Sequence, residues 1–322
     1  MMEDGRSKTA LRIIFAGSGE FGLPTLTALH ANHQIVQIFS QPDRPAGRGR
    51  ALTPTPIAQF ALDHNLPLTR TSDINAESLP PADLIIVIAF GQKISEAVGN
   101  HPRLGSVNLH SSRLPKYRGA APINWAILSG ETVTGNSIIR LAQRMDAGAI
   151  LAMSSLEIGD LETAGELHDR LANDGAPLML QTLHQLASNT ATETHQDESH
   201  ATKAPKLNRD STKIDWTHPA PKIANQIRGM YPWPGCRVQL LDQSNHELAR
   251  LTLVRARPVP AKPADSSVDS PPGTLTPQGT IITAEDALEI LEIQPEGKRP
   301  MPLTAYRNGH PWPAGAKLHS II

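Results

Sequence analysis

The sequence predicts an α/β fold: a doubly wound, mostly parallel sheet of the Rossmann-like kind, followed by a smaller β-barrel domain. At 322 residues the chain is about twice the ~150 residues of a comfortable single domain, so we expect two domains. Residues 11–100 alternate apolar, strand-like runs with helical stretches, a pattern typical of parallel sheets covered by helices. After residue 208 the strand-like runs are short and are cut by prolines, which favours an all-β domain.

Apolar runs place the elements of the first domain. The run 84–90 is uninterrupted and rich in β-branched residues, as a central strand buried on both faces should be. Residues 163–187 carry leucines at helical spacing and predict one long helix or two. The expected strands are 11–16, 35–39, 84–90, 106–110 and 135–141, and a short helix is expected at 122–128.

Apolar periodicity stops between Ser188 and Pro205, where Thr, Asn, Gln, His, Asp and Glu fill the sequence. We therefore expect a domain over 1–187, a linker over 188–207 and a second domain over 208–322. The second domain has strand-like runs at 236–241, 248–254, 280–282 and 287–293. An oligonucleotide-binding-like barrel fits this pattern, although strand propensity alone does not choose among all-β folds.

Composition narrows the class of protein. Thirty basic and 31 acidic residues argue against a protein held to nucleic acid or membrane by bulk positive charge. A single cysteine, Cys236, excludes a disulfide framework and a multi-cysteine metal site, and the 13 histidines include no metal-spaced cluster, so we expect no metal. The sequence has neither a secretory leader nor a membrane-length apolar run, and we expect a cytoplasmic protein without a membrane partner.

A glycine-rich segment follows the first expected strand. Residues 17–22 read G-x-G-x-x-G and lead into a helix, the context of a dinucleotide-binding turn. An acidic residue about 20 positions later would hold the ribose, and Asp43 stands near that distance but in a loop between proline and arginine. We favour a tight strand-to-helix turn over dinucleotide binding. An NAD-dependent oxidoreductase remains the alternative from another class of enzyme.

Two polar side chains end the strand at 106–110. Asn108 and His110 are two residues apart, so their side chains point to the same face of that strand. The carboxyl edge of an open α/β sheet is where ligands bind. Asn can donate to a developing oxyanion, and His can exchange a proton near neutral pH, which together suit acyl transfer. Taken alone, the spacing favours the other interpretation, in which both residues end the strand for turn or hydrogen-bonding reasons.

The residues that follow decide between these readings. The string Asn108-x-His110-x-Ser112-x-Leu114-Pro115, completed by Gly119-Ala120-x-Pro122, resembles the folate-dependent formyltransferases. Residues 145–150, Met-Asp-Ala-Gly-Ala-Ile, resemble the turn that supplies the family's aspartate. Residues 12–17, 41–49 and 227–235 extend the resemblance over nearly the whole chain, toward the branch of the family that acts on methionyl initiator tRNA.

The resemblance implies a function. It implies transfer of the formyl group of 10-formyltetrahydrofolate to the α-amine of methionyl initiator tRNA for translation initiation, with no obligate protein partner. It also implies that the C-terminal barrel helps to hold the tRNA. The catalytic residues implied are Asn108, His110 and Asp146. The folate-binding residues implied are Phe90, Gly91, Ser112, Arg113, Leu114 and Pro115, with Arg113 standing where the family usually has leucine. The tRNA-binding residues implied are Arg44, Arg48, Arg50 and Lys206.

Other functions stay open at this point. A formyltransferase that acts on glycinamide ribonucleotide or on an amino sugar would use the same donor, but the basic segment 41–50 and the domain 208–322 count against it. A tRNA-binding module without catalysis would not need the three catalytic residues.

Overall fold

The structure is a computed structural model that describes residues 10–46, 49, 51–260 and 270–322. It divides into two compact units. Unit 1 comprises Met1–Gly119, Thr134–Leu156 and His168–Ala204, and unit 2 comprises Ala120–Val133, Glu157–Leu167 and Pro205–Ile322. The polar segment 188–207, which the sequence assigns to a linker, is thus divided between the units after Ala204.

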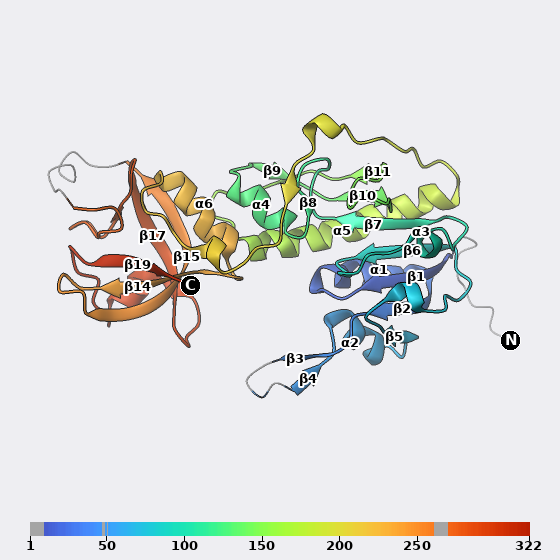
Figure 1. Cartoon of the computed structure of the whole chain (residues 1–322), viewed down its shortest axis with the longest axis horizontal. Helices are drawn as coiled ribbons and strands as arrows, with labels where there is room; N and C mark the ends of the chain where they lie inside the picture. Colours follow the sequence, from blue (N-terminus) through green and yellow to red (C-terminus); the bar gives the residue numbers. More distant parts are fainter. Residues whose placement is uncertain (1–9, 47–48, 50, 261–269) are drawn as a thin grey trace. The chain divides into compact units, whose positions relative to one another are not determined.

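Unit 1 is built on a seven-stranded sheet in the order β11-β10-β7-β6-β1-β2-β5 (Figure 1). These strands are β1 (Arg12–Gly17), β2 (Gln34–Ser40), β5 (Leu68–Arg70), β6 (Leu84–Ile88), β7 (Ser106–His110), β10 (Ser137–Arg140) and β11 (Ile150–Met153). β1, β2, β5, β6 and β7 pair in parallel, and β10 is antiparallel to both β7 and β11. The predicted doubly wound, mostly parallel sheet is confirmed.

Helices and short turns connect these strands. They are η1 (Glu20–Gly22), α1 (Leu23–Asn32), α2 (Pro56–Asp63), η2 (Ile74–Ala76), α3 (Glu96–Gly99), η3 (Glu198–His200) and the unit 1 part of α5 (Ala164–Ala187). Helix α2 begins where Thr55 accepts a hydrogen bond from the Ala58 amide at 3.1 Å and Pro56 fixes the first turn. Helix α2 thereby lies between the parallel strands β2 and β5 in the chain.

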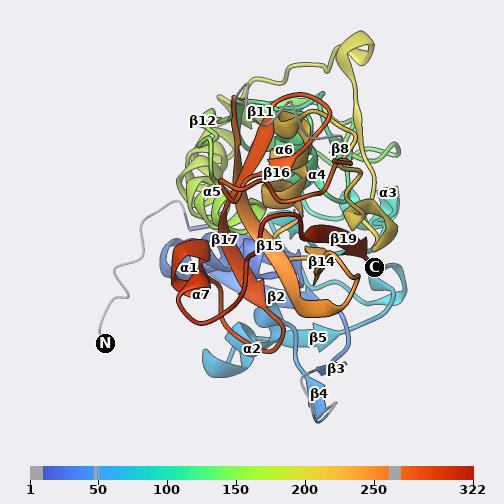
Figure 2. The ribbon, with the colours of Figure 1, turned by 90° about the vertical axis from the view of Figure 1, so that its left-hand side faces the viewer.

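Short strand pairs complete unit 1. The hairpin of β3 (Arg44–Ala46) and β4 (Ala51–Thr53) extends away from the sheet in both Figure 1 and Figure 2. β8 (Arg118–Gly119) pairs in parallel with β13 (Lys203–Ala204). β9 (Val133–Thr134) pairs with β12 (Leu156–Glu157).

The sheet of unit 1 is held by apolar contacts on both faces. All five residues of β6 are buried, as the uninterrupted apolar run predicts. Ile14, Ile85, Phe39 and Phe90 share one buried cluster that joins the central strands. The carboxyl ends of β6 and β7 are therefore fixed by a packed core, and polar side chains at these ends have defined positions.

Unit 2 is an antiparallel half-barrel, in agreement with the predicted oligonucleotide-binding-like domain. Its sheet has the order β16-β17-β15-β14-β19, with β18 beside β17. The strands are β14 (Cys236–Leu241), β15 (Glu247–Val259), β16 (Ile281–Ile282), β17 (Ala287–Pro295), β18 (Met301–Pro302) and β19 (Lys317–Ile321). The helices are α4 (Pro122–Leu128), η4 (Asp210–Thr212), α6 (Ala220–Met230) and α7 (Leu303–Arg307).

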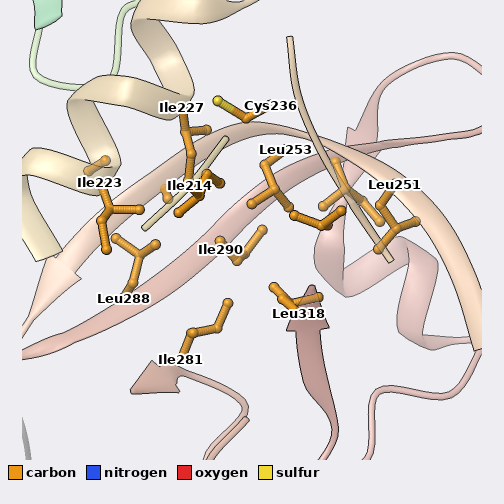
Figure 3. Close-up of a cluster of buried hydrophobic side chains, with 14 of the residues drawn as sticks. Ile214, Ile223, Ile227, Cys236, Leu251, Leu253, Ile281, Leu288, Ile290 and Leu318 are labelled. Carbon is orange, nitrogen blue, oxygen red and sulfur yellow. The ribbon is translucent and has the colours of Figure 1, made fainter. Parts of the chain in front are cut away.

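Helix α6 closes the core of unit 2. Ile223 and Ile227 on α6 belong to the same buried cluster as Leu253, Leu288 and Ile290 from β15 and β17 (Figure 3). All five side chains are at most 2% exposed, so burial of apolar surface fixes the helix on the sheet. Figure 2 shows α6 beside the long strands β15 and β17.

Candidate active site

Strand β7 brings the two predicted strand-end residues to one place. Asn108 pairs with Val87 of β6 on one side and with Ile139 of β10 on the other. Asn108 is half-buried and His110 is 6% exposed, and their side chains lie on one face of the strand. Among the described residues the Asn108 carboxamide has no hydrogen-bond partner, so its N–H donors remain available to a ligand.

Both nitrogens of the His110 ring face protein oxygens. Nε2 lies 2.9 Å from the backbone oxygen of Tyr117, and because a carbonyl only accepts, Nε2 carries the proton of that hydrogen bond. Nδ1 lies 3.7 Å from Oδ1 of Asp146, within ion-pair distance but too far for a hydrogen bond. A proton at Nδ1 would therefore face the Asp146 carboxylate.

Asp146 lies in the loop that joins β10 to β11. Its side chain is 13% exposed, and its backbone has the positive φ of 54° that non-glycine residues rarely adopt. Its Oδ2 accepts a hydrogen bond from the Gly119 amide at 2.9 Å. The structure thus brings the predicted trio of Asn108, His110 and Asp146 together within unit 1.

Close backbone approach explains a glycine in the same loop. A Cβ on Gly148 would lie 1.8 Å from the backbone oxygen of Arg140, a distance that no side chain can adopt. The loop that carries Asp146 is thereby packed directly against the end of β10.

The residues 112–115 form a tightly bonded turn after β7. The hydroxyl of Ser112 donates to the Lys116 carbonyl at 2.7 Å, and Ser137 of β10 donates to the Ser112 carbonyl at 2.6 Å. The same Ser137 hydroxyl accepts from the Leu114 amide at 3.1 Å. Ser112 and Leu114 are buried, whereas Arg113 is exposed and Pro115 is half-buried. Of the four predicted folate-binding residues in this turn, Ser112 and Leu114 are thus buried and hold the turn together by hydrogen bonds.

Phe90 and Gly91 lie just beyond the carboxyl end of β6. The Phe90 side chain is buried in the core at 1% exposure. The Phe90 carbonyl accepts a hydrogen bond from the side-chain amide of Gln41 at 2.8 Å. Gly91 has a φ of +77°. The side chain of Gln92 donates to the Thr71 carbonyl at 2.7 Å and accepts from the Ile74 backbone amide at 2.9 Å. Gln92 therefore has a structural role in unit 1.

The glycine-rich segment forms the predicted tight turn. β1 ends at Gly17, η1 begins at Glu20, and a Cβ on Gly17 would lie 2.8 Å from the Ile88 carbonyl. Asp43, the acid considered for a ribose, instead has its Oδ1 3.2 Å from Nε of Arg70. The glycines thus allow close packing of β1 on β6.

The predicted tRNA-binding residues fall in different parts of the chain. Arg44 is exposed on β3, and its guanidinium donates to the Gln41 carboxamide oxygen. Arg48 and Arg50 lie outside the described residues. Lys206 is exposed and belongs to unit 2.

The structure adds residues that the sequence did not single out. Gln196 binds the backbone of the Asp146 loop, and Glu198 lies near two arginines, with 2.9 Å to Arg118 and 2.8 Å to Arg144. Hydrogen bonds from Arg118, the larger contribution, and from Arg144 lower the pKa of Glu198 to about 2. No sequence signal pointed to these contacts, because they join a polar segment to residues about 50 to 80 positions away.

Metal clusters and membrane-spanning helices are two features that the described residues do not show. No cluster of three or more His, Cys, Asp or Glu side chains suited to a metal ion occurs in 10–46, 49, 51–260 and 270–322. Within the same ranges, every helix is too short or too polar to cross a membrane.

Known proteins resemble this chain over nearly its whole length. A family model described as formyl transferase matches residues 11–183, and one described as the C-terminal domain of formyl transferase matches 206–311. The curated methionyl-tRNA formyltransferase of Methylococcus capsulatus is 39% identical over 93% of this chain and 97% of its own length. That of Moorella thermoacetica is 38% identical over 97% of this chain and 100% of its own. The chain belongs to the methionyl-tRNA formyltransferase family.

Solved structures agree on the fold of this formyltransferase chain. The N-formyltransferase of Helicobacter canadensis, in complex with folinic acid and dTDP-3-aminofucose, matches with a TM-score of 0.63 at 15% identity, over 87% of this chain and 98% of that one. The sugar 3N-formyltransferase WlaRD, solved in the presence of dTDP and 5-N-formyl-THF, matches with a TM-score of 0.61 at 18% identity, over 90% and 99% of the two chains. At such low identity the likeness concerns the fold alone.

The close approach at Gly148 gives a testable prediction. Gly148→Ala should lower the free energy of unfolding by about 1–3 kcal/mol, because the added Cβ displaces the loop from Arg140. Urea unfolding followed by circular dichroism measures the change. Gly309→Ala is the control, since no atom lies within 4 Å of its Cβ, and it should stay within about 0.5 kcal/mol of the parent. Equal stability of both variants would contradict the predicted strain.

Proposed function

We propose that this protein transfers the formyl group of 10-formyltetrahydrofolate to the α-amine of methionyl initiator tRNA. The observation that carries the proposal is the convergence of Asn108, His110 and Asp146, in a chain 36–39% identical to curated methionyl-tRNA formyltransferases. The product is N-formylmethionyl-tRNA for translation initiation, and the enzyme works in the cytoplasm, where translation starts. Residues 1–187 serve as the catalytic domain, 188–207 as the connecting segment and 208–322 as the tRNA-binding domain.

Asn108 stabilises the charge that develops during transfer. The amine nitrogen forms a bond to the formyl carbon, the formyl oxygen becomes an oxyanion, and the bond from carbon to N10 of the donor then breaks. The Asn108 carboxamide, which has no hydrogen-bond partner in the described part of the chain, donates to that oxyanion. A donor already held in place costs no reorganisation during the reaction.

His110 and Asp146 handle the proton that the amine must lose. Nε2 of His110 is bound to the Tyr117 carbonyl, so Nδ1 is the nitrogen that takes this proton. Asp146, with Oδ1 at 3.7 Å, stabilises the proton at Nδ1 until it passes to N10 of the donor. The amine nitrogen thereby loses the proton that N10 gains.

The turns beside β6 and β7 suit a folate-derived donor. Phe90, Ser112 and Leu114 bury their side chains and hold the turns in place, while Gly91 and Arg113 are exposed and Pro115 is half-buried. Backbone amides and carbonyls recognise the donors and acceptors of a planar heterocycle such as a pterin. We assign residues 90–91 and 112–115 to the folate-binding site on this basis.

Local charge holds the tRNA. Arg44, Arg48, Arg50 and Lys206 supply cations to the phosphate backbone, although the chain as a whole carries a net charge of −1. A guanidinium has five N–H donors, and the one hydrogen bond from Arg44 to Gln41 leaves others for phosphate.

The direct test is an assay with defined substrates. The purified protein, 10-formyltetrahydrofolate and charged initiator tRNA should yield formylmethionyl-tRNA, detected by acid gel electrophoresis. Charged elongator tRNA and free methionine should react at least about tenfold more slowly, because they lack part of the binding surface. Formylation of an amino sugar or of glycinamide ribonucleotide, with none of charged initiator tRNA, would overturn the proposal.

Asn108→Ala tests the oxyanion donor. It should lower kcat by about 10²–10³-fold, because one preorganised donor is lost, and should leave the fold intact. Steady-state kinetics with both substrates measure the change. Asn173→Ala is the matched control, since Asn173 lies exposed on α5 and its carboxamide donates to the Asp169 carbonyl, one turn earlier in the same helix. A kcat of Asn108→Ala within twofold of the parent would remove Asn108 from the mechanism.

Arg44→Ala tests the contact with tRNA. The KM for tRNA should rise by about tenfold, because one charge-assisted hydrogen bond to tRNA is lost. The KM for the formyl donor should stay unchanged. The salt dependence of tRNA binding should weaken by about one unit of slope. Arg12→Ala, which removes an exposed cation at the amino end of β1 in unit 1, is the control for removal of one positive charge. Equal effects of the two variants would argue against a specific role of Arg44.

A further inference from the structure

The segment 194–204 of unit 1 is bonded to both loops of the candidate active site. At its start, Thr194 exchanges two backbone hydrogen bonds with Ile150 of β11, at 2.8 and 2.9 Å. At its end, Lys203–Ala204 pairs with Arg118–Gly119. In Figure 1 this segment follows α5 as the yellow trace at the top of the view and comes down beside β8. Its two ends therefore fix it to the Asp146 loop and to the segment after Tyr117.

One side chain in this segment joins the two loops directly. The amide nitrogen Nε2 of Gln196 donates to the backbone oxygens of Asp146 and Gly148, both at 2.8 Å. Its Oε1 accepts from Nε and Nη2 of Arg118, at 3.1 and 2.7 Å. The half-buried Gln196 thus uses both ends of its carboxamide.

The two loops that Gln196 joins hold the two acceptors around His110. One loop carries the Asp146 carboxylate, and the other carries the Tyr117 carbonyl and the Gly119 amide that binds Asp146. Asp146 also has a φ of +54°, a conformation that persists in non-glycine residues only where surrounding contacts hold it. The hydrogen bond from Gln196 to the Asp146 carbonyl is such a contact.

We propose that Gln196 is a positioning residue of the active site, which sets the separation between the Asp146 carboxylate and the His110 ring. The kinetic test of this inference rests on the proposed function, whereas the test by NMR of the His110 ring does not. Gln196 touches neither of the reacting groups, and it acts through the backbone of the Asp146 loop.

The neighbouring ion pairs support Gln196 but do not replace it. Glu198 pairs with Arg118 and Arg144, and its side chain is 52% exposed. Water and salt weaken pairs at such an exposed site. Glu198 reaches the Asp146 loop only through the Arg144 side chain, which is 70% exposed, whereas Gln196 binds the backbone oxygens of Asp146 and Gly148 themselves.

Gln196→Glu and Gln196→Met test the hydrogen bonds made by the two ends of the carboxamide. Glu keeps the oxygen that faces Arg118 but places a carboxylate oxygen against two carbonyl oxygens, whereas Met removes every polar contact at similar length. Both variants should lower kcat by about 10–100-fold with the KM of each substrate within about twofold, because the binding surfaces stay in place. If one of the two variants does not fold, the other still tests the role of Gln196.

A second readout is independent of activity. In protein labelled with ¹⁵N-histidine, the His110 imidazole resonances should shift in both variants. Glu193→Gln is the matched control, because it breaks the 2.8 Å ion pair with Arg140 just before the same segment and touches neither loop of the site. It should leave kcat and the His110 resonances unchanged.

The outcomes are distinct. Unchanged kcat, a loss of kcat equal to that of Glu193→Gln, or a loss explained by the unfolded fraction would overturn the role of Gln196. A lower kcat with unshifted His110 resonances would overturn it too, since Gln196 would then act by another route. If the parent enzyme does not formylate tRNA, the proposed function fails, while the His110 resonances still test the positioning.

Discussion

The two oxygens that face the His110 ring both come from outside the strand that carries it. Strand β7 fixes the ring through its pairing with β6 and β10, but the Tyr117 carbonyl and the Asp146 carboxylate come from separate loops. Neither loop has regular secondary structure long enough to define its position alone. The geometry of the site therefore depends on how these two loops are held to each other, and the Gly119 amide and Gln196 make that connection.

Sheet and loops contribute differently to the site. Asn108 sits between two neighbouring strands, and β6 beside it is buried at all five residues, so a packed core sets its position. Asp146 depends instead on hydrogen bonds and on the absence of a side chain at Gly148. The position of Asn108 thus depends on the stability of the whole sheet, whereas the position of Asp146 beside His110 depends on a few polar contacts that can open locally.

The sequence predicted the parts of the fold that rest on local patterns. Strand β7 and helix α4 begin and end where the sequence placed them, because β-branched and apolar runs with turn signals on both sides define them. Strand β15 runs on to Val259, beyond the predicted 254, since Arg255 and Arg257 pair across to Glu292 and Glu289 of β17. A charged continuation of this kind is visible only once the partner strand is known.

The same reasoning explains why the return of residues 194–204 to the site was not foreseen. Apolar periodicity reports burial against a core, and this segment is held by amide, carboxylate and backbone groups instead. A glutamine in a polar stretch carries no sign of its partners, whereas Asn108 and His110 could be placed because a strand has a fixed alternation of faces. The parts of a catalytic site that lie on regular elements are therefore open to prediction from one sequence. The contacts that set the distance between those parts are not, because they are made by side chains whose partners are chosen only by the folded chain.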